Sequence, residues 1–181
     1  MRLVLACVLA AASVAAFAQT EGAAWIDVPF VRQPHDGCGA ASLSMLMQYW
    51  AHQQGQPPSP DSAVSTIQQT LYVPAEHGIP ASSMKSYLQQ HGFLVFAVNG
   101  HWSDLQEQIR KGRPLIAALR PQGDRALHYV VIDGIDSARG LVMMNDPADR
   151  KLLSEERAAF EKDWSATGYW MLLAVPSPSA H

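Results

Sequence analysis

The sequence is poor in cysteine and in charge, and these two scarcities argue against several classes of protein. Its 181 residues include only two cysteines, Cys7 and Cys38. Neither a disulfide framework nor a zinc site built on several thiolates is therefore expected. Charged residues make up 16% of the chain, with 13 basic and 16 acidic side chains and a net charge of -3. Because no basic stripe is present, we expect no nucleic-acid partner.

Motifs for cofactors, catalytic metals and repeats are also missing. The chain contains no glycine-rich phosphate loop and no H-E-x-x-H sequence, so we expect no cofactor and no metallopeptidase zinc site. Neither an internal repeat nor a linker long enough to separate two domains is visible. Hydrophobic residues nevertheless make up 48% of the sequence, which is sufficient for one domain with a sizeable core.

The main apolar run lies at the N-terminus and has the features of a signal peptide. Arg2 gives a short positive region, residues 3–16 are apolar, and Ala-Phe-Ala at 16–18 fits a cleavage site before Gln19. The run is shorter than the roughly 20 residues that cross a bilayer, and a core helix is the alternative interpretation. We expect residues 1–18 to be a signal peptide and the protein to be exported, periplasmic or secreted, without a membrane anchor.

The mature chain, residues 19–181, is expected to fold as one α+β domain with most of its helices first. Helical periodicity and apolar runs indicate the elements. The predicted helices cover residues 38–50, 62–71, 82–91, 103–111 and a short stretch within 154–160. The predicted strands cover residues 26–31, 93–98, 114–119, 128–135, 141–145 and 169–175. The strands 128–135 and 141–145 are predicted to form a hairpin, and residues 176–181 a flexible tail.

Cys38 lies where the first helix is predicted to begin, and after signal removal it is the only cysteine. Free backbone N–H groups at a helix start stabilise an anion, so the thiolate form is favoured there. The neighbouring Gly37 and Gly39 leave the approach to the sulfur open. Gln33 lies on the loop that enters the helix, where its carboxamide can donate a hydrogen bond to a developing oxyanion. A buried, inert cysteine is the alternative.

His128 begins the strongest predicted strand and is the candidate base for this thiol. Asp146 follows the strand predicted to pair with it, so the hairpin would place both side chains at one end of the sheet. A histidine bonded only to backbone, and ordinary turn chemistry at Asn145-Asp146-Pro147, are the alternatives. Asn145 is a second candidate for orienting the imidazole, because a carboxamide serves that role in papain-like sites.

Together these segments resemble the C39 group of papain-like cysteine peptidases over nearly the whole mature chain. The resemblance implies a papain-like fold, with the cysteine helix packed on a C-terminal antiparallel sheet. It implies Cys38 as nucleophile, His128 as general acid and base, Asp146 as orienting residue and Gln33 as oxyanion donor. The residues that carry it are Gln33, Cys38-Gly39-Ala40-Ala41-Ser42-Leu43-Ser44-Met45, His128-Tyr129-Val130-Val131, Asn145-Asp146-Pro147 and the late Phe160…Trp164 segment.

The chain also departs from the family pattern. Gln33 stands five positions before Cys38, one fewer than is common, and Gly37 replaces the acid that often precedes the cysteine, with Asp36 one further back. The best-known members are domains of ABC exporters that cut leader peptides after a double glycine. We expect here an exported, stand-alone peptidase that acts on a peptide or protein, and a double-glycine cleavage site follows by analogy only.

Two other functions remain open at this stage. One is a cell-wall amidase, endopeptidase or transpeptidase on the same scaffold, which release of wall fragments would reveal. The other is a catalytically inactive, peptide-binding accessory protein, which an unreactive Cys38 would indicate.

Overall fold

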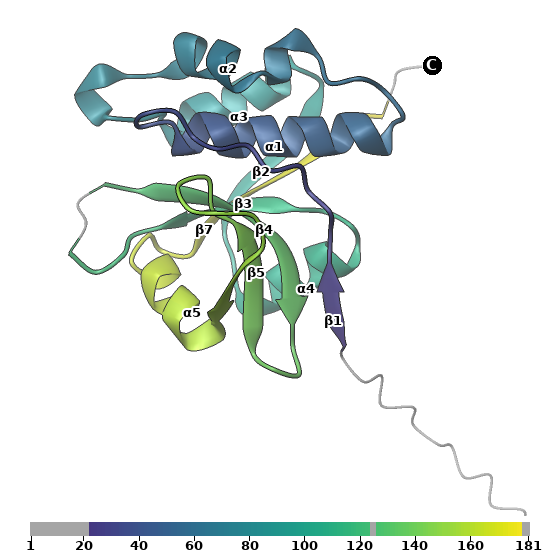
Figure 1. Ribbon diagram of the computed structural model, residues 1–181, viewed down its shortest axis with the longest axis vertical. Helices are drawn as coiled ribbons and strands as arrows, with labels where there is room; N and C mark the ends of the chain where they lie inside the picture. Colours follow the sequence, from purple (N-terminus) through teal and green to yellow (C-terminus); the bar gives the residue numbers. More distant parts are fainter. Residues whose placement is uncertain (1–21, 124–125, 179–181) are drawn as a thin grey trace, which may run out of the picture.

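The computed structural model describes residues 22–123 and 126–178, in which helices and an antiparallel sheet form an α+β fold (Figure 1). The predicted signal peptide, residues 1–18, lies outside the described residues, as do residues 179–181 of the predicted tail. Helices α1, α2 and α3 lie together above the sheet in Figure 1, and α4 and α5 flank its lower part. No helix in the described ranges is long and apolar enough to cross a membrane.

Most helices come early in the chain and most strands late. The helices are α1 (Cys38–Gln53), α2 (Val64–Leu71), α3 (Ala81–Gln90), α4 (Trp102–Arg110) and α5 (Arg157–Ser165), with 3₁₀ turns η1 (Pro60–Ser62) and η2 (Pro74–Glu76). The strands are β1 (Ala23–Trp25), β2 (Phe93–Asn99), β3 (Leu115–Leu119), β4 (His128–Asp136), β5 (Leu141–Asn145), β6 (Leu153–Glu156) and β7 (Trp170–Pro176). The sheet order is β2-β7-β3-β4-β5-β6, and β1 pairs with β4.

Helix α1 packs across the sheet and is buried along most of its length. Small residues open it, and Gly39 lies so close to Ile79 that an added Cβ would stand 3.2 Å from the Ile79 Cβ. The Ser42 hydroxyl donates a hydrogen bond to the Tyr129 carbonyl at 3.2 Å. This bond holds the first turns of α1 against the start of β4, so the helix that begins with Cys38 and the strand that begins with His128 are brought together.

The predicted hairpin of β4 and β5 is confirmed. Val131 pairs with Asn145 and Asp136 with Leu141, so the start of β4 lies beside the end of β5. The ladder shifts between Ile132 and Gly134, and Asp133 lies within this bulge. Asp133 is fully buried, and neither of its carboxylate oxygens has a hydrogen-bond partner on another described residue.

Two predicted elements were wrong in place or type. The run 26–31 is not a strand: β1 precedes it, and single hydrogen bonds such as Ile26 N–H to the Asp133 carbonyl hold it to the sheet. The stretch predicted to hold a short helix begins instead with the edge strand β6, and α5 starts only at Arg157. The β6 residues are half-exposed and include two acids, so pairing with β5 forms this strand without an apolar side-chain pattern.

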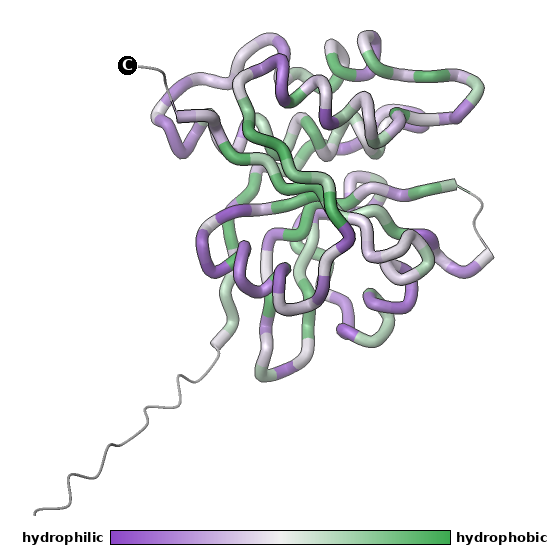
Figure 2. The backbone as a smooth tube through the Cα atoms, turned by 180° about the vertical axis from the view of Figure 1, so that it is seen from behind, coloured by the Kyte–Doolittle hydropathy of each residue, from purple (hydrophilic) through white to green (hydrophobic). Residues whose placement is uncertain are grey.

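Apolar residues follow the central strands (Figure 2). In that view, strongly hydrophobic strands cross the middle of the molecule, and hydrophilic residues collect at the loops. On the edge strand β2, the apolar side chains of Leu94, Phe96 and Val98 are exposed. The other face of β2 contacts α3, where Val95 is buried.

Candidate active site

Cys38 is the first residue of α1, and its thiol is partly exposed. Gly37 precedes the helix without a side-chain cap, and the first turn contains no acidic residue. The free N–H groups of this turn therefore remain available to a negative charge at the sulfur or at a bound carbonyl oxygen. Position 37 has no room for a side chain, since an added Cβ would stand 2.5 Å from the Pro34 ring.

His128 at the start of β4 pairs with Asp146 just after β5. The distance between His128 Nε2 and Asp146 Oδ1 is 2.8 Å, and the two side chains are only 23% and 17% exposed. Because Nε2 contacts the carboxylate, Nδ1 is the ring nitrogen left for the thiol of Cys38, whose proximity helps to raise the pKa of this imidazole. Cysteine, histidine and aspartate thus come together from α1, β4 and the turn after β5.

The site stabilises a charged imidazole. Burial alone would lower the pKa of His128, but the hydrogen bonds and negative charges of Asp146 and Cys38 outweigh it and raise the pKa to about 9. For Asp146, burial acts to raise the pKa, and the bond to His128, its charge and the N–H groups of Ala148 and Asp149 outweigh this effect. The pKa of Asp146 is therefore lowered, and the pair is an ion pair at neutral pH.

The backbone of Gln33 is hydrogen-bonded to the turn that carries Asp146. Its N–H donates to the Pro147 carbonyl at 3.0 Å, while the guanidinium of Arg32 donates to the carbonyl oxygens of Ala148 and Asp149. The Gln33 Oε1 atom is buried without a hydrogen-bond partner among the described residues. The loop that enters α1 is thus fixed beside the turn that carries Asp146, and the oxyanion role of Gln33 stays a prediction.

Asn145, the second candidate for orienting the imidazole, is used elsewhere. It is fully buried, its Nδ2 donates to the Val28 carbonyl at 3.2 Å, and its Oδ1 accepts from the Leu152 N–H at 3.0 Å. Both ends of the carboxamide therefore hold backbone segments, and it is Asp146 that contacts His128.

A cavity of about 410 Å³ opens beside Cys38. Loop residues Glu76 and Ile79 line it from one side, and Leu127 and Tyr129 from the other. Burial and the charges of Cys38 and Glu76 raise the pKa of Tyr129 to about 12, so its ring stays neutral. The loop was not predicted as part of the site, because its only sequence signal is a helix-breaking Gly-Ile-Pro at 78–80, which carries no link to Cys38.

Asp36 ties this loop to the cysteine loop. Its Oδ2 atom lies 3.5 Å from ring nitrogens of His35 and His77 and accepts a hydrogen bond from the Tyr72 hydroxyl at 3.1 Å. Asp36 has a φ of 52°, a left-handed conformation that these contacts hold in place. Within residues 22–123 and 126–178, no group of three or more His, Cys, Asp or Glu side chains is arranged to hold a metal ion.

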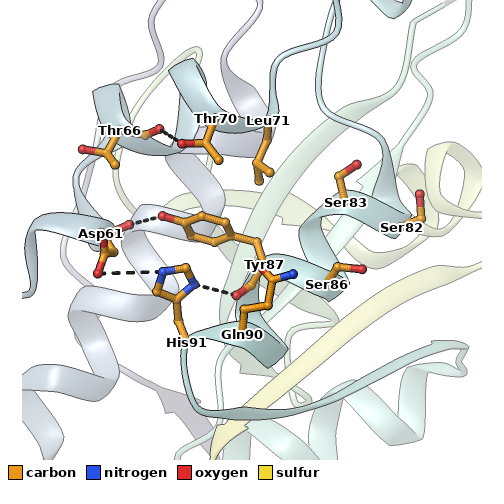
Figure 3. A pocket seen from close by; sticks show the side chains of 10 residues that line it. All are labelled: Asp61, Thr66, Thr70, Leu71, Ser82, Ser83, Ser86, Tyr87, Gln90 and His91. Carbon is orange, nitrogen blue, oxygen red and sulfur yellow. Dashed lines mark hydrogen bonds and ion pairs between the residues drawn. The ribbon is translucent and has the colours of Figure 1, made fainter.

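A second histidine–carboxylate pair joins the 3₁₀ turn η1 to the end of α3 and provides a comparison (Figure 3). Figure 3 shows His91 facing Asp61, and the distance between His91 Nε2 and Asp61 Oδ2 is 3.8 Å. The other ring nitrogen contacts the Tyr87 carbonyl at 2.7 Å within the same helix end. Serine and threonine hydroxyls line this cavity of about 430 Å³, but it contains no cysteine. The pair is a useful control for His128 and Asp146.

Comparisons with known proteins agree with this fold. The fold is that of C39-like, papain-like cysteine peptidases. The model of the Peptidase C39-like family matches residues 25–171, so the chain belongs to this family. None of the curated proteins matches it.

Solved structures show the same fold at low sequence identity. A C39-like peptidase from Bacillus anthracis is 16% identical, with a TM-score of 0.66, and the match covers 87% of this chain and 99% of that one. The peptidase domain of Streptococcus ComA, a bifunctional ABC transporter, is 19% identical, with a TM-score of 0.63 and coverage of 82% and 98%. A double-glycine-motif protease from an AMS/PCAT transporter, in complex with its leader peptide, is 20% identical, with a TM-score of 0.62 and coverage of 87% and 96%.

Proposed function

We propose that this protein is a cysteine peptidase whose nucleophile is Cys38. The observation that carries the proposal is the partly buried 2.8 Å pair of His128 and Asp146 beside a cysteine at a helix start. An imidazolium held by a carboxylate keeps a neighbouring thiol in its thiolate form. Membership of the C39-like family supports peptide bonds as the substrate.

The proposed reaction proceeds through a thioester. The Cys38 thiolate attacks the peptide carbonyl carbon, and the negative oxygen accepts hydrogen bonds from the Cys38 N–H and the Gln33 carboxamide. His128 donates its proton to the leaving amine, the C–N bond breaks, and an acyl-enzyme remains. The neutral imidazole then takes a proton from water, whose oxygen attacks the thioester and releases the acid and the thiolate. Asp146 holds the ring orientation throughout.

We infer that the substrate is an extended peptide and that the protein meets it after export. The signal-like sequence of residues 1–18 supports export. Gly78, Ala81 and Ala126 line the cavity beside Cys38, and such short side chains leave room for a peptide backbone close to the sulfur. One structural relative is a double-glycine-motif protease, which makes a pair of small residues before the cleaved bond the first substrate to try.

Alkylation of Cys38 by iodoacetamide tests the thiolate directly. We expect Cys38 of the unaltered protein to react rapidly at about pH 6. The His128→Ala variant should react at least about tenfold more slowly at this pH, since its thiol no longer has a cationic partner. His91→Ala is the matched control, because it removes a histidine that also faces a carboxylate. Slow alkylation of the unaltered protein, equal to that of His128→Ala, would contradict the proposal and favour a binding protein without catalysis.

A further inference from the structure

A second cavity, of about 520 Å³, lies between the start of α4, the helix α5 and the residue before β7. Its walls include Trp102, Gln106, Arg157, Glu161 and Tyr169. It shares no lining residue with the cavity beside Cys38, and α4 and α5 lie away from α1 in Figure 1. Cavities of this size are typical of small-molecule sites.

Tyr169 is held in an unfavourable backbone conformation at the edge of this cavity. Its φ is 60°, a left-handed value that is rare for a bulky aromatic residue. The N–H of Tyr169 donates to the Trp164 carbonyl at 3.0 Å, and its carbonyl accepts from the Gly100 N–H at 2.9 Å. The ring meets Trp164 edge-on, yet the residue remains 41% exposed. A strained backbone conformation that hydrogen bonds hold on both sides is often found at ligand sites. Here the strained residue is also partly exposed to solvent.

Arg157 is the second fixed group. Its guanidinium carbon lies 4.7 Å from the centre of the Trp102 ring, and its NH2 atom lies 3.0 Å from Glu161 Oε1. A guanidinium has five N–H donors, and a carboxylate accepts several hydrogen bonds, so one contact between them leaves further donors and acceptors available. The cavity therefore offers both kinds of hydrogen-bonding group next to an exposed ring.

The charges around the cavity do not favour an anion. Arg157 is balanced by Glu161, and the start of α4 is already closed by the capping box of His101 and Asp104. The His101 N–H donates to Asp104 Oδ2 at 2.7 Å, which places another carboxylate at this end of the helix. A phosphate or carboxylate would meet as much negative as positive charge here.

We propose that this cavity binds a neutral saccharide. The C–H face of a sugar ring packs on the Tyr169 ring, hydroxyl oxygens accept hydrogen bonds from Arg157, and hydroxyl hydrogens are donated to Glu161. This combination of an aromatic surface and paired donors and acceptors matches a ligand whose hydroxyls serve as both donor and acceptor. The site is separate from the proposed peptidase site, and its binding does not depend on the reactivity of Cys38.

Titration calorimetry tests this with four probes: chitotetraose, cellotetraose, maltotetraose and the anionic tetragalacturonate. We expect saturable binding of at least one neutral tetrasaccharide and none of the anionic probe. Tyr169→Asn should weaken that binding at least about tenfold, because asparagine adopts the left-handed conformation readily but has no ring. Trp25→Ala is the control, since Trp25 is an exposed aromatic residue that does not line this cavity.

A second variant separates loss of binding from loss of folding. Glu161→Gln replaces one acceptor oxygen of a partly exposed side chain by an amide group and should also weaken binding, while the Cys38 alkylation rate stays unchanged in both variants. Failure of all three neutral probes to bind, preference for tetragalacturonate, or full-strength binding by folded Tyr169→Asn or by Glu161→Gln would overturn the proposal. None of these results bears on the peptidase proposal.

Discussion

The contact between His128 Nε2 and Asp146 Oδ1 decides which ring nitrogen serves the thiol. At neutral pH both ring nitrogens carry a proton, because the pKa of His128 is raised to about 9. The carboxylate fixes Nε2 at 2.8 Å, which leaves Nδ1 for the proposed proton transfer with Cys38. In the 3.8 Å pair of His91 and Asp61, the second ring nitrogen instead contacts the Tyr87 carbonyl. The His91 imidazole is therefore paired with a backbone group and not with a thiol.

Replacing the carboxylate tests this at the scale of one residue. We expect Asp146→Asn to lower the pKa of His128 from about 9 toward its ordinary value of 6.5, because the negative charge is lost while the shape is kept. Peptidase turnover should fall by roughly 10²–10⁴-fold, since the carboxamide no longer stabilises the imidazolium. NMR titration of the histidine rings measures the first effect, and steady-state kinetics the second.

Asp61→Asn is the matched control for this substitution. It changes the carboxylate that faces His91 and should leave turnover and the His128 titration unchanged. If Asp146→Asn left the His128 titration where it was, the carboxylate would not be the group that holds the imidazolium.

The loop before α1 constrains the position of Cys38 by steric contact. Gly37 donates its N–H to the Pro34 carbonyl at 3.0 Å, and this turn brings the proline ring over the glycine Cα. An added Cβ would stand 2.5 Å from Pro34 ring carbons and 2.9 Å from its carbonyl oxygen. No real side chain fits at those distances, so the backbone of the cysteine loop would have to move.

Gly37→Ala should therefore reduce the alkylation rate of Cys38 and lower stability by about 1–3 kcal/mol, the usual cost of overpacking. Gly78→Ala is the control from the same cavity, where an added Cβ meets nothing closer than 3.8 Å. Alkylation rates and urea unfolding of both variants provide the comparison. Equal behaviour of the two variants would show that the Pro34 contact does not position the cysteine.

Elements with a strong local pattern could be predicted from the sequence, and those made by long-range contacts could not. The apolar runs of β4 and β5 and their short connection predict the hairpin, and the hairpin brings His128 and Asp146 together. Strand β6 lacks such a pattern, because its place depends on backbone pairing with β5. The cavity loop at residues 76–81 meets the cysteine segment through long-range contacts, such as Ile79 with Gly39 and His77 with Asp36, and no local sequence pattern predicts these contacts.

At the scale of the whole molecule, stability depends on pH, and Asp133, His128 and Asp146 are three of the groups with shifted pKa values that contribute to this dependence. Burial raises the pKa of Asp133 to about 7, so stability is lost as the pH rises from its ordinary pKa of 3.8 to about 7. The raised pKa of His128 stabilises the fold fully below 6.5, and this contribution is lost as the pH rises through about 9. The lowered pKa of Asp146 stabilises the fold above 3.8 and ceases to do so as the pH falls below that value.

We therefore expect the free energy of unfolding to be highest at about pH 4–6 and to decrease toward pH 9, by roughly 2–3 kcal/mol from His128 alone. Urea unfolding at about pH 5, 7 and 9 measures the decrease. Asp133→Asn should remove much of the loss between pH 5 and 7, because an amide of the same shape cannot ionise. A curve that is flat over this range, or an equal loss in the variant, would contradict the assignment.

The contact of Arg32 and Gln33 with residues 147–149 also determines when in folding the chain can become reactive. The bonded residues are 116 and 117 positions apart for Arg32, so this contact closes across most of the sequence. Such distant contacts form late, after local helices and hairpins. A partly synthesised or partly folded chain therefore carries its cysteine without the imidazolium and without the fixed entry loop. For the proposed peptidase, we expect this order of assembly to keep unfolded segments of the chain from being cut by its own Cys38.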